Sequence, residues 1–421
     1  MSVIQVCGLT PLKGEISIQG SKNAVLPMMA AALLHRGVTV LTNVPVIRDV
    51  ACMLDILESL GCRCCHKGDC LVMDARSVTG TSIPEEYVTA MRSSIVVLSA
   101  LLGRMGEGSC CYPGGCLIGA RPIDLHLMAL RALGADIRER DGTIEASCRK
   151  NGGLKGTEIH LSYPSVGATE QAILASVLAD GVTIIHQAAR EPEISQMCRF
   201  LNNMGAVICG MGTDHLMVQG VAGLHDSSFR VEGDRIVAGT YGAAVVAAGG
   251  EALLRGICPS DLKVPLEEFQ KAGAAVDADE KNRQIRICMG KRPLPLLIKT
   301  EPYPGFPTDL QSPLLVAMAL ADGESRLKET IFNDRFVVVA ELNRMGTEID
   351  VQDNKLACIP GGRRLTGRQV TASELRGGAA LVVAGLCAEG LTAVGNRYFI
   401  DRGYEDICRD LRQLGADIDS W

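Results

Sequence analysis

The sequence predicts an α/β fold with two similar domains, in each of which three repeated units place apolar helices inside and sheets outside. Three observations predict this fold: a motif that recurs six times, helices that are apolar on nearly every side, and a length of 421 residues. A chain of this length exceeds what one hydrophobic core usually serves, so two or more domains are expected.

The repeated motif is a helix-like stretch that ends in an apolar residue and Gly, followed by an alternating strand. LRALGADI and LRQLGADI are two of its six copies, whose glycines lie 68 to 73 residues apart. Gly adopts the left-handed conformation that ends a helix without a side-chain clash, and the residues after it favour a strand. The six glycines are Gly61, Gly134, Gly205, Gly273, Gly346 and Gly415.

A second glycine motif keeps the same period, and each copy again joins an Ala/Leu-rich helix to a short strand. Each unit is therefore expected to contain two helices and several strands. Helices such as 24–34 and 377–387 are apolar nearly all round, so they belong inside, with sheets outside them. Three units precede Arg230 and three follow it. The second motif predicts helix stops at Gly37, Gly108, Gly181, Gly250, Gly323 and Gly390.

Charge and hydropathy exclude two classes of partner. The formal net charge of -6 argues against a nucleic-acid binder, which needs a basic surface. A small anionic substrate remains compatible, because a local cluster of Arg and Lys can oppose the global sign. No segment reaches the roughly 18 apolar residues of a membrane span. Residues 1–12 lack the features of a secretory signal, so we expect a cytoplasmic protein.

The 17 cysteines are odd in number and lack framework spacing, which is typical of reduced thiols in a cytosol. One cluster invites a zinc interpretation: Cys62, Cys64, Cys65, His66 and Cys70. A structural zinc site needs pairs of ligands at regular spacing, which this cluster lacks. We interpret Cys62 and Cys64 as small alternating strand residues.

The segment IQGSKNAVLP is the first candidate for chemistry. A strand leads through Gly20 and Ser21 into a helix that begins near Lys22 and Asn23. A cation and an amide at a helix N-terminus favour anions, because the free N–H groups and the macrodipole attract negative charge. The alternatives are a solvated lysine after a capping serine, or a Schiff-base lysine.

The second candidate is Cys116 in the segment CYPGGCLIGARPIDLH. Its glycines make a flexible loop, and Pro122 marks a helix start. A thiol ahead of a helix N-terminus, with Arg121 nearby, is expected to have a lowered pKa and to exchange a proton near neutrality. An inert thiol is the alternative.

Arginines and one carboxylate complete the candidates. Guanidinium groups match carboxylate and phosphate groups, although each arginine could also lie on a helix surface. Asp309 follows two prolines and a threonine at a helix start, where a simple N-cap is the alternative to a catalytic role. The candidate arginines are Arg92, Arg121, Arg376 and Arg402.

Taken together, these segments resemble the enolpyruvyl transferase family along essentially the whole chain. The matches include GSKNAVLP, MRSS, GGCLIGARPIDLH, PSVGAT and AAREPEI, and then FPTDLQ, ETIF, DRF, RMG and IDRGYE. No single segment is specific for the family, but so many matches in the same order are. Within the family, the resemblance is to members that use UDP-N-acetylglucosamine.

The resemblance implies two inside-out α/β barrel domains of three repeats each, in agreement with the six units. It assigns residues 22–230, with the Cys116 loop, to the first domain. Residues 1–21 and 231–421, with Asp309 and Arg402, form the second. It also implies transfer of the enolpyruvyl group of phosphoenolpyruvate to the 3-hydroxyl of UDP-N-acetylglucosamine, with release of phosphate. This is the first committed step of peptidoglycan synthesis, which serves cell-wall formation, cell shape and cell division.

Residue roles follow from the same resemblance. Asp309 takes the proton of the sugar hydroxyl as it attacks C2 of the enolpyruvate, and Cys116 protonates the methylene carbon or forms a covalent adduct. No metal, organic cofactor or protein partner is implied. Phosphoenolpyruvate is held by Lys22, Arg121 and Arg402, supported by Arg92 and Arg376, and the sugar nucleotide contacts Asn23, Ser165, Val166, Gly167 and Ile331.

Three positions depart from the family pattern, and two other functions stay open. Glu374 replaces a usual Asp, Asn333 a common Glu, and Phe399 a common His. One rival is 3-phosphoshikimate 1-carboxyvinyltransferase, whose first motif typically has Ser instead of Asn23 and which lacks the loop cysteine. The other is a non-catalytic paralogue that binds UDP-sugars, against which the intact catalytic candidates argue.

Overall fold

The computed structural model describes residues 3–114, 119 and 122–420, which form two compact units. The first unit comprises residues 20–114 and 122–232, and the second comprises residues 3–19, 119 and 233–420. We propose that these units are the two domains expected from the sequence.

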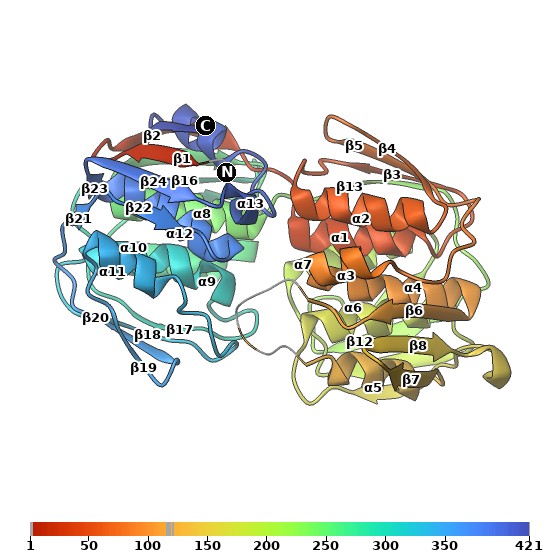
Figure 1. Cartoon of the computed structure of the whole chain (residues 1–421). Helices are drawn as coiled ribbons and strands as arrows, with labels where there is room; N and C mark the ends of the chain where they lie inside the picture. The colour runs from red at the N-terminus through yellow and green to blue at the C-terminus, as the bar shows by residue number, and fades with distance from the viewer. Residues whose placement is uncertain (1–2, 115–118, 120–121, 421) are drawn as a thin grey trace. The chain divides into compact units, whose positions relative to one another are not determined.

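The first unit contains three repeats, each with a buried helix, a strand, a half-buried helix and a hairpin (Figure 1). The first repeat comprises α1 (Lys22–Ala32), β3 (Val38–Thr42), α2 (Arg48–Ser59), β4 (Arg63–Lys67) and β5 (Cys70–Asp74). The second comprises α3 (Glu85–Ala90), the 3-10 helix η1 (Arg92–Ile95), α4 (Val96–Met105), β6 (Glu107–Cys111), α5 (Asp124–Ala132), β7 (Asp136–Arg140) and β8 (Thr143–Ser147). The third comprises β9 (Glu158–His160), α6 (Val166–Ser176), β10 (Val182–His186), α7 (Pro192–Asn203), β11 (Val207–Cys209), β12 (His215–Gln219) and β13 (Ser227–Arg230).

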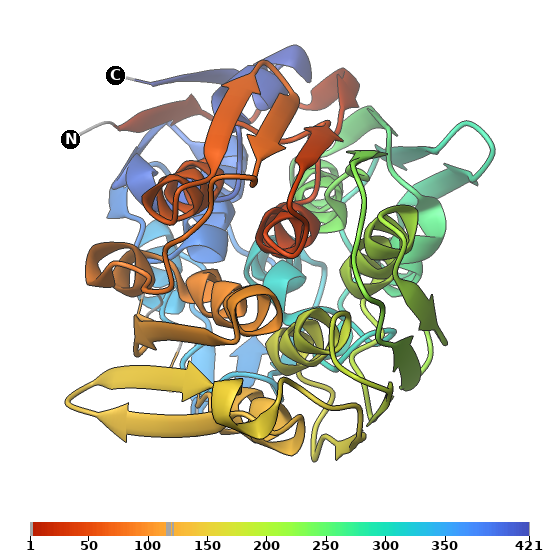
Figure 2. The same ribbon diagram turned by 90° about the vertical axis from the view of Figure 1, so that its right-hand side faces the viewer.

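Three sheets surround the buried helices of this unit. Their strand orders are β13-β3-β5-β4, β6-β8-β7 and β11-β12-β10-β9. Figure 2 shows α1 end-on near the middle of the unit and the hairpins at its periphery. The last strand of one repeat pairs with a sheet of another, as β13 does in parallel with β3, so the three repeats close on themselves.

The second unit repeats this plan. Its fourth repeat comprises α8 (Arg235–Ala248), β14 (Gly250–Arg255), α9 (Lys263–Lys271), β15 (Ala275–Asp279) and β16 (Gln284–Met289). The fifth comprises β17 (Leu297–Lys299), the 3-10 helix η4 (Thr308–Leu310), α10 (Gln311–Leu320), β18 (Ser325–Lys328), α11 (Val339–Met345), β19 (Asp350–Gln352) and β20 (Leu356–Ile359). The sixth comprises β21 (Leu365–Thr366), β22 (Gln369–Thr371), α12 (Leu375–Cys387), β23 (Ala388–Glu389), β24 (Leu391–Gly395), α13 (Arg397–Ile400), α14 (Ile407–Gln413) and β25 (Asp417–Ser420).

Two N-terminal strands complete the second unit. β1 (Ile4–Cys7) lies antiparallel between β24 and β25, and β2 (Leu12–Ser17) pairs in parallel with β14. The resulting sheets have the orders β22-β24-β1-β25, β15-β16-β14-β2 and β17-β18-β20-β19. The first residues of the chain therefore belong with the last ones.

The buried helices form the core of each unit, as the sequence predicts. In the second unit every residue of α12 after Leu375 is buried, as is every residue of α10 before Leu320. Burial on all sides explains why these helices carry almost no charge, since an unpaired charge there would be costly. Truncating one core side chain, such as Leu381→Ala, is expected to cost ~2–5 kcal/mol of stability. The predicted fold class is confirmed.

The first glycine motif behaves as predicted. All six of its glycines have positive φ, between 85° and 106°, and each closely follows the end of a half-buried helix. The second motif is wrong at Gly37 and Gly108, which lie outside the left-handed region. At α4 the left-handed residue is Gly106 instead. Gly108 serves packing, because a Cβ there would lie 3.0 Å from the Leu98 side chain.

The longest uncharged run of the sequence, residues 236–250, contains most of α8, a buried helix of the second unit. This helix has 14 residues, whereas a span of the bilayer needs about 20. Among the helices of the described residues, none combines the length and the apolar character that crossing a membrane requires.

The cysteine-rich segment forms the hairpin of β4 and β5, and Cys64 and His66 are half-buried while Cys65 is exposed. This alternation is that of an ordinary edge strand. The Cys62 thiol donates to the carbonyl oxygen of Asp74 at 3.4 Å. Every cysteine among the described residues is a free thiol.

Candidate functional site

Most of the predicted site residues lie at the N-terminal ends of the buried helices. Backbone N–H groups of the first helical turn point outward there, and the helix dipole adds positive potential, so these ends suit anionic ligands. Their positions are Lys22 and Asn23 on α1, Arg92 on η1 before α4, Ser165, Val166 and Gly167 at α6, Asp309 on η4 before α10, and Arg376 on α12.

Asp309 is the centre of an ion-pair cluster. Its Oδ1 accepts a hydrogen bond from Nη2 of Arg335 at 2.9 Å, and its Oδ2 accepts one from Nη2 of Arg376 at 3.2 Å. The two guanidinium side chains are only 2% and 4% exposed, against 28% for Asp309. Two buried cations thus fix a carboxylate that is partly open to solvent, through charge-assisted hydrogen bonds.

Asp309 is not a helix cap. The N-cap residues of η4 and α10 are Pro307 and Leu310, so the simple-cap interpretation is wrong. The Asp309 side chain instead accepts hydrogen bonds from the two arginines.

Arg376 is a buried cation. Its guanidinium carbon lies 5.7 Å from the centroid of the Tyr404 ring, whose hydroxyl is 2.8 Å from Oγ1 of Thr240. Burial alone lowers the pKa of Arg376, but the charges of Asp309, Tyr404 and Asp234 outweigh burial and raise the pKa above its ordinary value. Its Nη1 is buried and has no hydrogen-bond partner among the described residues, which leaves one donor for a ligand oxygen. The surface-arginine interpretation is wrong for this residue.

Glu374, which replaces the family's usual aspartate, caps α12. Its Oε2 accepts from the backbone N–H of Arg376 at 2.8 Å, and its Oε1 accepts from the N–H of Gly377. The same carboxylate lies 3.8 Å from Nη1 of Arg335. A Cβ on Gly377 would lie 2.5 Å from Oε1 of Glu374, so the longer side chain fits because a glycine stands there.

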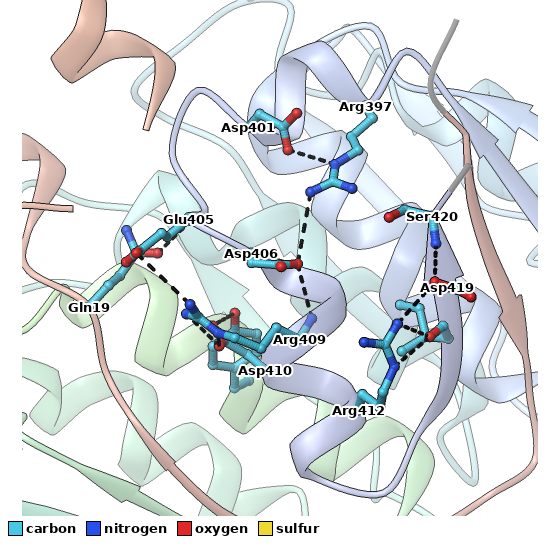
Figure 3. Close-up of polar contacts among 12 residues, drawn as sticks. Gln19, Arg397, Asp401, Glu405, Asp406, Arg409, Asp410, Arg412, Asp419 and Ser420 are labelled. Atoms are coloured by element: carbon cyan, nitrogen blue, oxygen red, sulfur yellow. Dashed lines mark hydrogen bonds and ion pairs between the residues drawn. The ribbon is translucent and has the colours of Figure 1, made fainter. Parts of the chain in front are cut away.

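Arg402 is half-buried in a segment whose backbone is fixed on its C-terminal side (Figure 3). The buried Gln19 donates through Nε2 to the carbonyl oxygen of Gly403 at 3.1 Å. The Oε1 of Gln19 accepts from the N–H of Glu405 at 2.7 Å. Residue 19, from the start of the chain, therefore positions the IDRGYE motif near its end.

Arg397 and Arg409 contact acidic residues in this motif and directly after it (Figure 3). Arg397 on α13 donates through Nε to Asp401 at 2.9 Å and lies 3.8 Å from Asp406. Asp406 also caps α14 by accepting from the N–H of Arg409 at 3.0 Å. These contacts fix the backbone on both sides of Arg402.

In the first unit, Lys22 is paired and largely buried. Its Nζ lies 2.7 Å from Oδ2 of Asp49, and the two side chains are 12% and 4% exposed. Ser21 occupies the N-cap of α1 but makes no capping hydrogen bond through its side chain. The interpretation of Lys22 as a solvated lysine after a capping serine is therefore wrong. Asn23 follows it and is half-buried.

The segment Ser165, Val166 and Gly167 forms the start of α6. Ser165 is the N-cap, and its Oγ accepts from the N–H of Ala168 at 3.4 Å. A Cβ on Gly167 would lie 2.6 Å from Nε2 of His126, so glycine lets the imidazole approach the backbone of this turn. The first N–H groups of α6 and the imidazole of His126 therefore lie side by side at this turn.

Arg92 lies in the same unit and donates through Nη2 to the carbonyl oxygen of Pro122 at 3.3 Å. This bond ties η1 to the residues that lead into α5. The two predicted site residues Cys116 and Arg121 lie outside the described residues, so their predicted roles remain predictions.

Ile331 is positioned by a buried carboxylate. Glu329 accepts from the N–H of Ile331 at 2.7 Å and from that of Phe332 at 3.1 Å, and its other oxygen accepts from Oγ1 of Thr308 at 2.9 Å. Thr308 precedes Asp309, so Glu329 links the Ile331 turn to the ion-pair cluster. Of the other departures, Asn333 is exposed and Phe399 half-buried.

Sequence reasoning missed three charged residues of these clusters: Arg335, Asp49 and Glu329. The motif that contains Arg335, DRF, contributed to the resemblance, but nothing in it indicated a contact with Asp309. Glu329 likewise begins the matched segment ETIF, which indicated no contact for it. For Asp49 the signal was weaker still, because a carboxylate near a helix start is common in soluble proteins.

The opposite ends of the second unit's buried helices line a cavity of about 760 Å³. Ala248, Leu320 and Cys387, the last residues of α8, α10 and α12, all lie on its wall. The three helices therefore run in the same direction, and their N-terminal ends share the other end of the unit. Of the predicted site residues that the structure describes, none lines this cavity.

Comparison with known proteins places these features in context. The family model described as EPSP synthase (3-phosphoshikimate 1-carboxyvinyltransferase) matches residues 6–411. The chain is 44% identical over 419 residues to UDP-N-acetylglucosamine 1-carboxyvinyltransferase 2 of Caldanaerobacter subterraneus subsp. tengcongensis, covering 99% of each chain. It is 45% identical over 412 residues to the protein of the same name from Carboxydothermus hydrogenoformans, covering 98% and 97%.

Solved structures agree on the fold. The enolpyruvyl transferase NikO from Streptomyces tendae superposes with a TM-score of 0.88 at 23% identity, over 100% of this chain and 98% of that one. EPSP synthase from Acinetobacter baumannii superposes with a TM-score of 0.75 at 17% identity, over 100% of both chains. At these identities the likeness concerns the fold alone.

Proposed function

This chain belongs to the EPSP synthase family of enolpyruvyl transferases, and from that premise we propose that it transfers the enolpyruvyl group of phosphoenolpyruvate to the 3-hydroxyl of UDP-N-acetylglucosamine, with release of phosphate. The observation that carries the proposal is its full-length likeness to transferases named for this acceptor. We further propose that the reaction takes place in the cytoplasm and serves peptidoglycan synthesis.

Asp309 is the proposed base. It takes the proton of the sugar 3-hydroxyl as that oxygen attacks C2 of phosphoenolpyruvate. Its two charge-assisted hydrogen bonds to Arg335 and Arg376 support this role, because they hold the carboxylate in one orientation. Effective general-base catalysis requires such fixed geometry.

Cys116 is the proposed acid at the other reacting carbon. It gives a proton to the methylene C3 of phosphoenolpyruvate while the sugar oxygen bonds to C2, which forms a tetrahedral intermediate. Loss of a C3 proton and of phosphate from this intermediate then yields the enol ether. The same thiol can instead add to C2 as a covalent adduct.

Lys22, Arg121 and Arg402 are the proposed ligands of phosphoenolpyruvate, with Arg92 and Arg376 in support. The buried Nη1 donor of Arg376 supports this assignment, as does the fixed backbone around Arg402. Guanidinium groups stabilise the changing charge on phosphate and carboxylate, which is usually the largest contribution to such catalysis. Asn23, the Ser165–Gly167 turn and Ile331 are the proposed contacts of the sugar nucleotide.

A phosphate-release assay with four substrate combinations tests the proposal. Release is expected with phosphoenolpyruvate plus UDP-N-acetylglucosamine, and not with either one alone. Release with shikimate 3-phosphate as the only productive acceptor would assign the chain to the rival transferase. Binding of UDP-N-acetylglucosamine by calorimetry without any release would leave the non-catalytic function.

A further inference from the structure

Three histidines lie in one row across the third sheet of the first unit. His186 of β10 is paired in register with His160 of the parallel strand β9 and with His215 of the antiparallel strand β12. Paired residues project to the same face of a sheet, and so does Glu158, two positions before His160. Four ionisable side chains therefore gather on one face of this sheet.

The side chains of Glu158, His160 and His186 converge on one point. Nε2 of His160 lies 3.5 Å from Oε2 of Glu158, and Nε2 of His186 lies 3.6 Å from the same oxygen. The three ligand atoms all lie within 4.8 Å of one another. Neighbouring ligands of a tetrahedral zinc ion, with bonds of about 2.0–2.2 Å, are separated by roughly 3.3–3.5 Å.

His186 supplies a second, independent indication of a ligand. Its Nε2 is buried and has no hydrogen-bond partner among the described residues, because the oxygen of Glu158 lies beyond hydrogen-bond distance. A buried ring nitrogen without a partner is costly. A bound cation would satisfy this nitrogen and join it to the exposed groups of His160 and Glu158.

We propose that Glu158, His160 and His186 form a binding site for a divalent cation of the zinc class on the solvent-facing side of this sheet. Two imidazoles and one carboxylate suit zinc, whereas magnesium and calcium prefer oxygen ligands alone. Water completes the coordination, since the side chains of Glu158 and His160 are 64% and 68% exposed.

Both imidazole rings must turn to bind one ion. The imidazoles of His160 and His186 are stacked with their planes 1° apart and their centroids 4.2 Å apart, so both must turn about Cβ–Cγ to direct their lone pairs at one ion. That torsion is broad for histidine. His215 packs edge-on against His186, with ring centroids 5.1 Å apart, and its Nδ1 is 2.8 Å from Oδ1 of Asp214. It limits how far the His186 ring can turn.

The site has a structural consequence. β9 and β10 both end at these histidines, and the chain after β9 leads within five residues to the Ser165 turn of α6. A bound cation would clamp the carboxyl ends of the two strands together. This inference does not depend on the proposed transferase function.

Zinc binding by the full-length, tag-free and chelator-stripped protein under reducing conditions tests the inference. Titration against a chromophoric zinc chelator is expected to reveal one site per chain. H160Q and H186Q are each expected to lower its affinity at least tenfold. E158Q, which changes only an exposed side chain, is expected to weaken binding while the apo protein keeps its melting temperature. H225Q is the matched control in the same unit and is expected to bind like the unsubstituted chain.

Thiols are the competing ligands, so a second measurement identifies the donor atoms. Cobalt bound at the proposed site is expected to lack sulfur-to-metal charge-transfer absorption, and a C64S/C65S variant is expected to bind zinc unchanged. The inference is overturned if no site is found, if affinity falls in C64S/C65S, or if H160Q and H186Q bind as tightly as H225Q.

Discussion

Asp309, Arg335 and Arg376 come from three separate segments and meet in one cluster. The sequence indicated Asp309 and Arg376 through the resemblance of their motifs. It also allowed a structural alternative for each, a helix N-cap for Asp309 and a position on a helix surface for Arg376. It could not indicate Arg335, because the contact of Arg335 with Asp309, 26 residues away, depends on how the segments before α10 and α11 pack. The same holds for Asp49, which pairs with Lys22 only because α1 and α2 are neighbours.

Replacing Asp309 by Asn is the most direct residue-scale prediction. The amide keeps the size of the side chain but cannot accept the sugar proton. We expect both substrates to bind and kcat to fall by about 10²–10⁴-fold, the usual contribution of a general base. Steady-state kinetics with both substrates, together with calorimetric binding, measure this effect.

Asp322→Asn is the matched control, because this exposed carboxylate follows the opposite end of the same helix, α10. It is expected to keep normal kinetics. Near-normal turnover of Asp309→Asn would remove Asp309 as the base.

Selective alkylation of Cys116 is the second residue-scale prediction. We expect a fosfomycin-like epoxide to label this thiol, since the loop sequence predicts a lowered pKa. Buried thiols are protected, because burial raises the pKa of Cys110 and of Cys198 to about 12. Peptide mass spectrometry locates the label. Labelling that persists in Cys116→Ser would show that another thiol reacts.

At the scale of elements, the N-termini of the buried helices unite the candidate residues. A helix that is buried on all sides can carry polar groups only at its ends, and at its N-terminal end these groups also meet the positive helix dipole. Residues that looked scattered in sequence, such as Lys22, Ser165 and Arg376, therefore occupy equivalent places in their repeats. Burial of the apolar helices dictates where the chemistry can lie.

The capping role of Glu374 leads to a prediction for α12. Glu374→Ala removes the acceptor for the first N–H groups of the helix and a nearby charge for Arg335. We expect the free energy of unfolding to fall by ~1–2 kcal/mol. Glu374→Asp, which restores the family's usual residue, is expected to recover most of that loss. Denaturant unfolding measures both.

Glu389→Ala is the control, because Glu389 is exposed just beyond the other end of α12. It is expected to change stability by no more than about 0.5 kcal/mol. Equal losses in the two alanine variants would argue against the capping role.

At the scale of the whole molecule, one buried carboxyl couples stability to pH. Glu170 on α6 is 7% exposed, and burial together with the charges of Glu193 and Glu191 raises its pKa from 4.5 to about 8. The folded chain therefore holds a proton at neutral pH that the unfolded chain releases. This contribution to stability is fully present below pH 4.5 and is lost as pH rises to about 8.

Glu170→Gln is expected to remove this dependence, because the amide does not ionise. Relative to the variant, the unsubstituted chain should lose ~1.4 kcal/mol of stability for each pH unit between about 5 and 8. Denaturant unfolding at several pH values measures the difference. Glu145→Gln, at an exposed position of β8, is the control and should follow the unsubstituted chain. If the stability of Glu170→Gln depends on pH in the same way as that of the unsubstituted chain, the raised pKa of Glu170 is contradicted.

The sequence by itself determined the α/β class, the six repeats, the inward position of the apolar helices and the candidate motifs. Periodic glycines and apolar runs are local signals, and local signals dictate where a helix ends and which face is buried. Tertiary structure alone decided that Gly106 rather than Gly108 ends α4, that Arg335 holds Asp309, and that three histidines form a row. The last two depend on distances between segments far apart in the chain, which only the packed fold establishes, and Gly108 is required by its packing against Leu98.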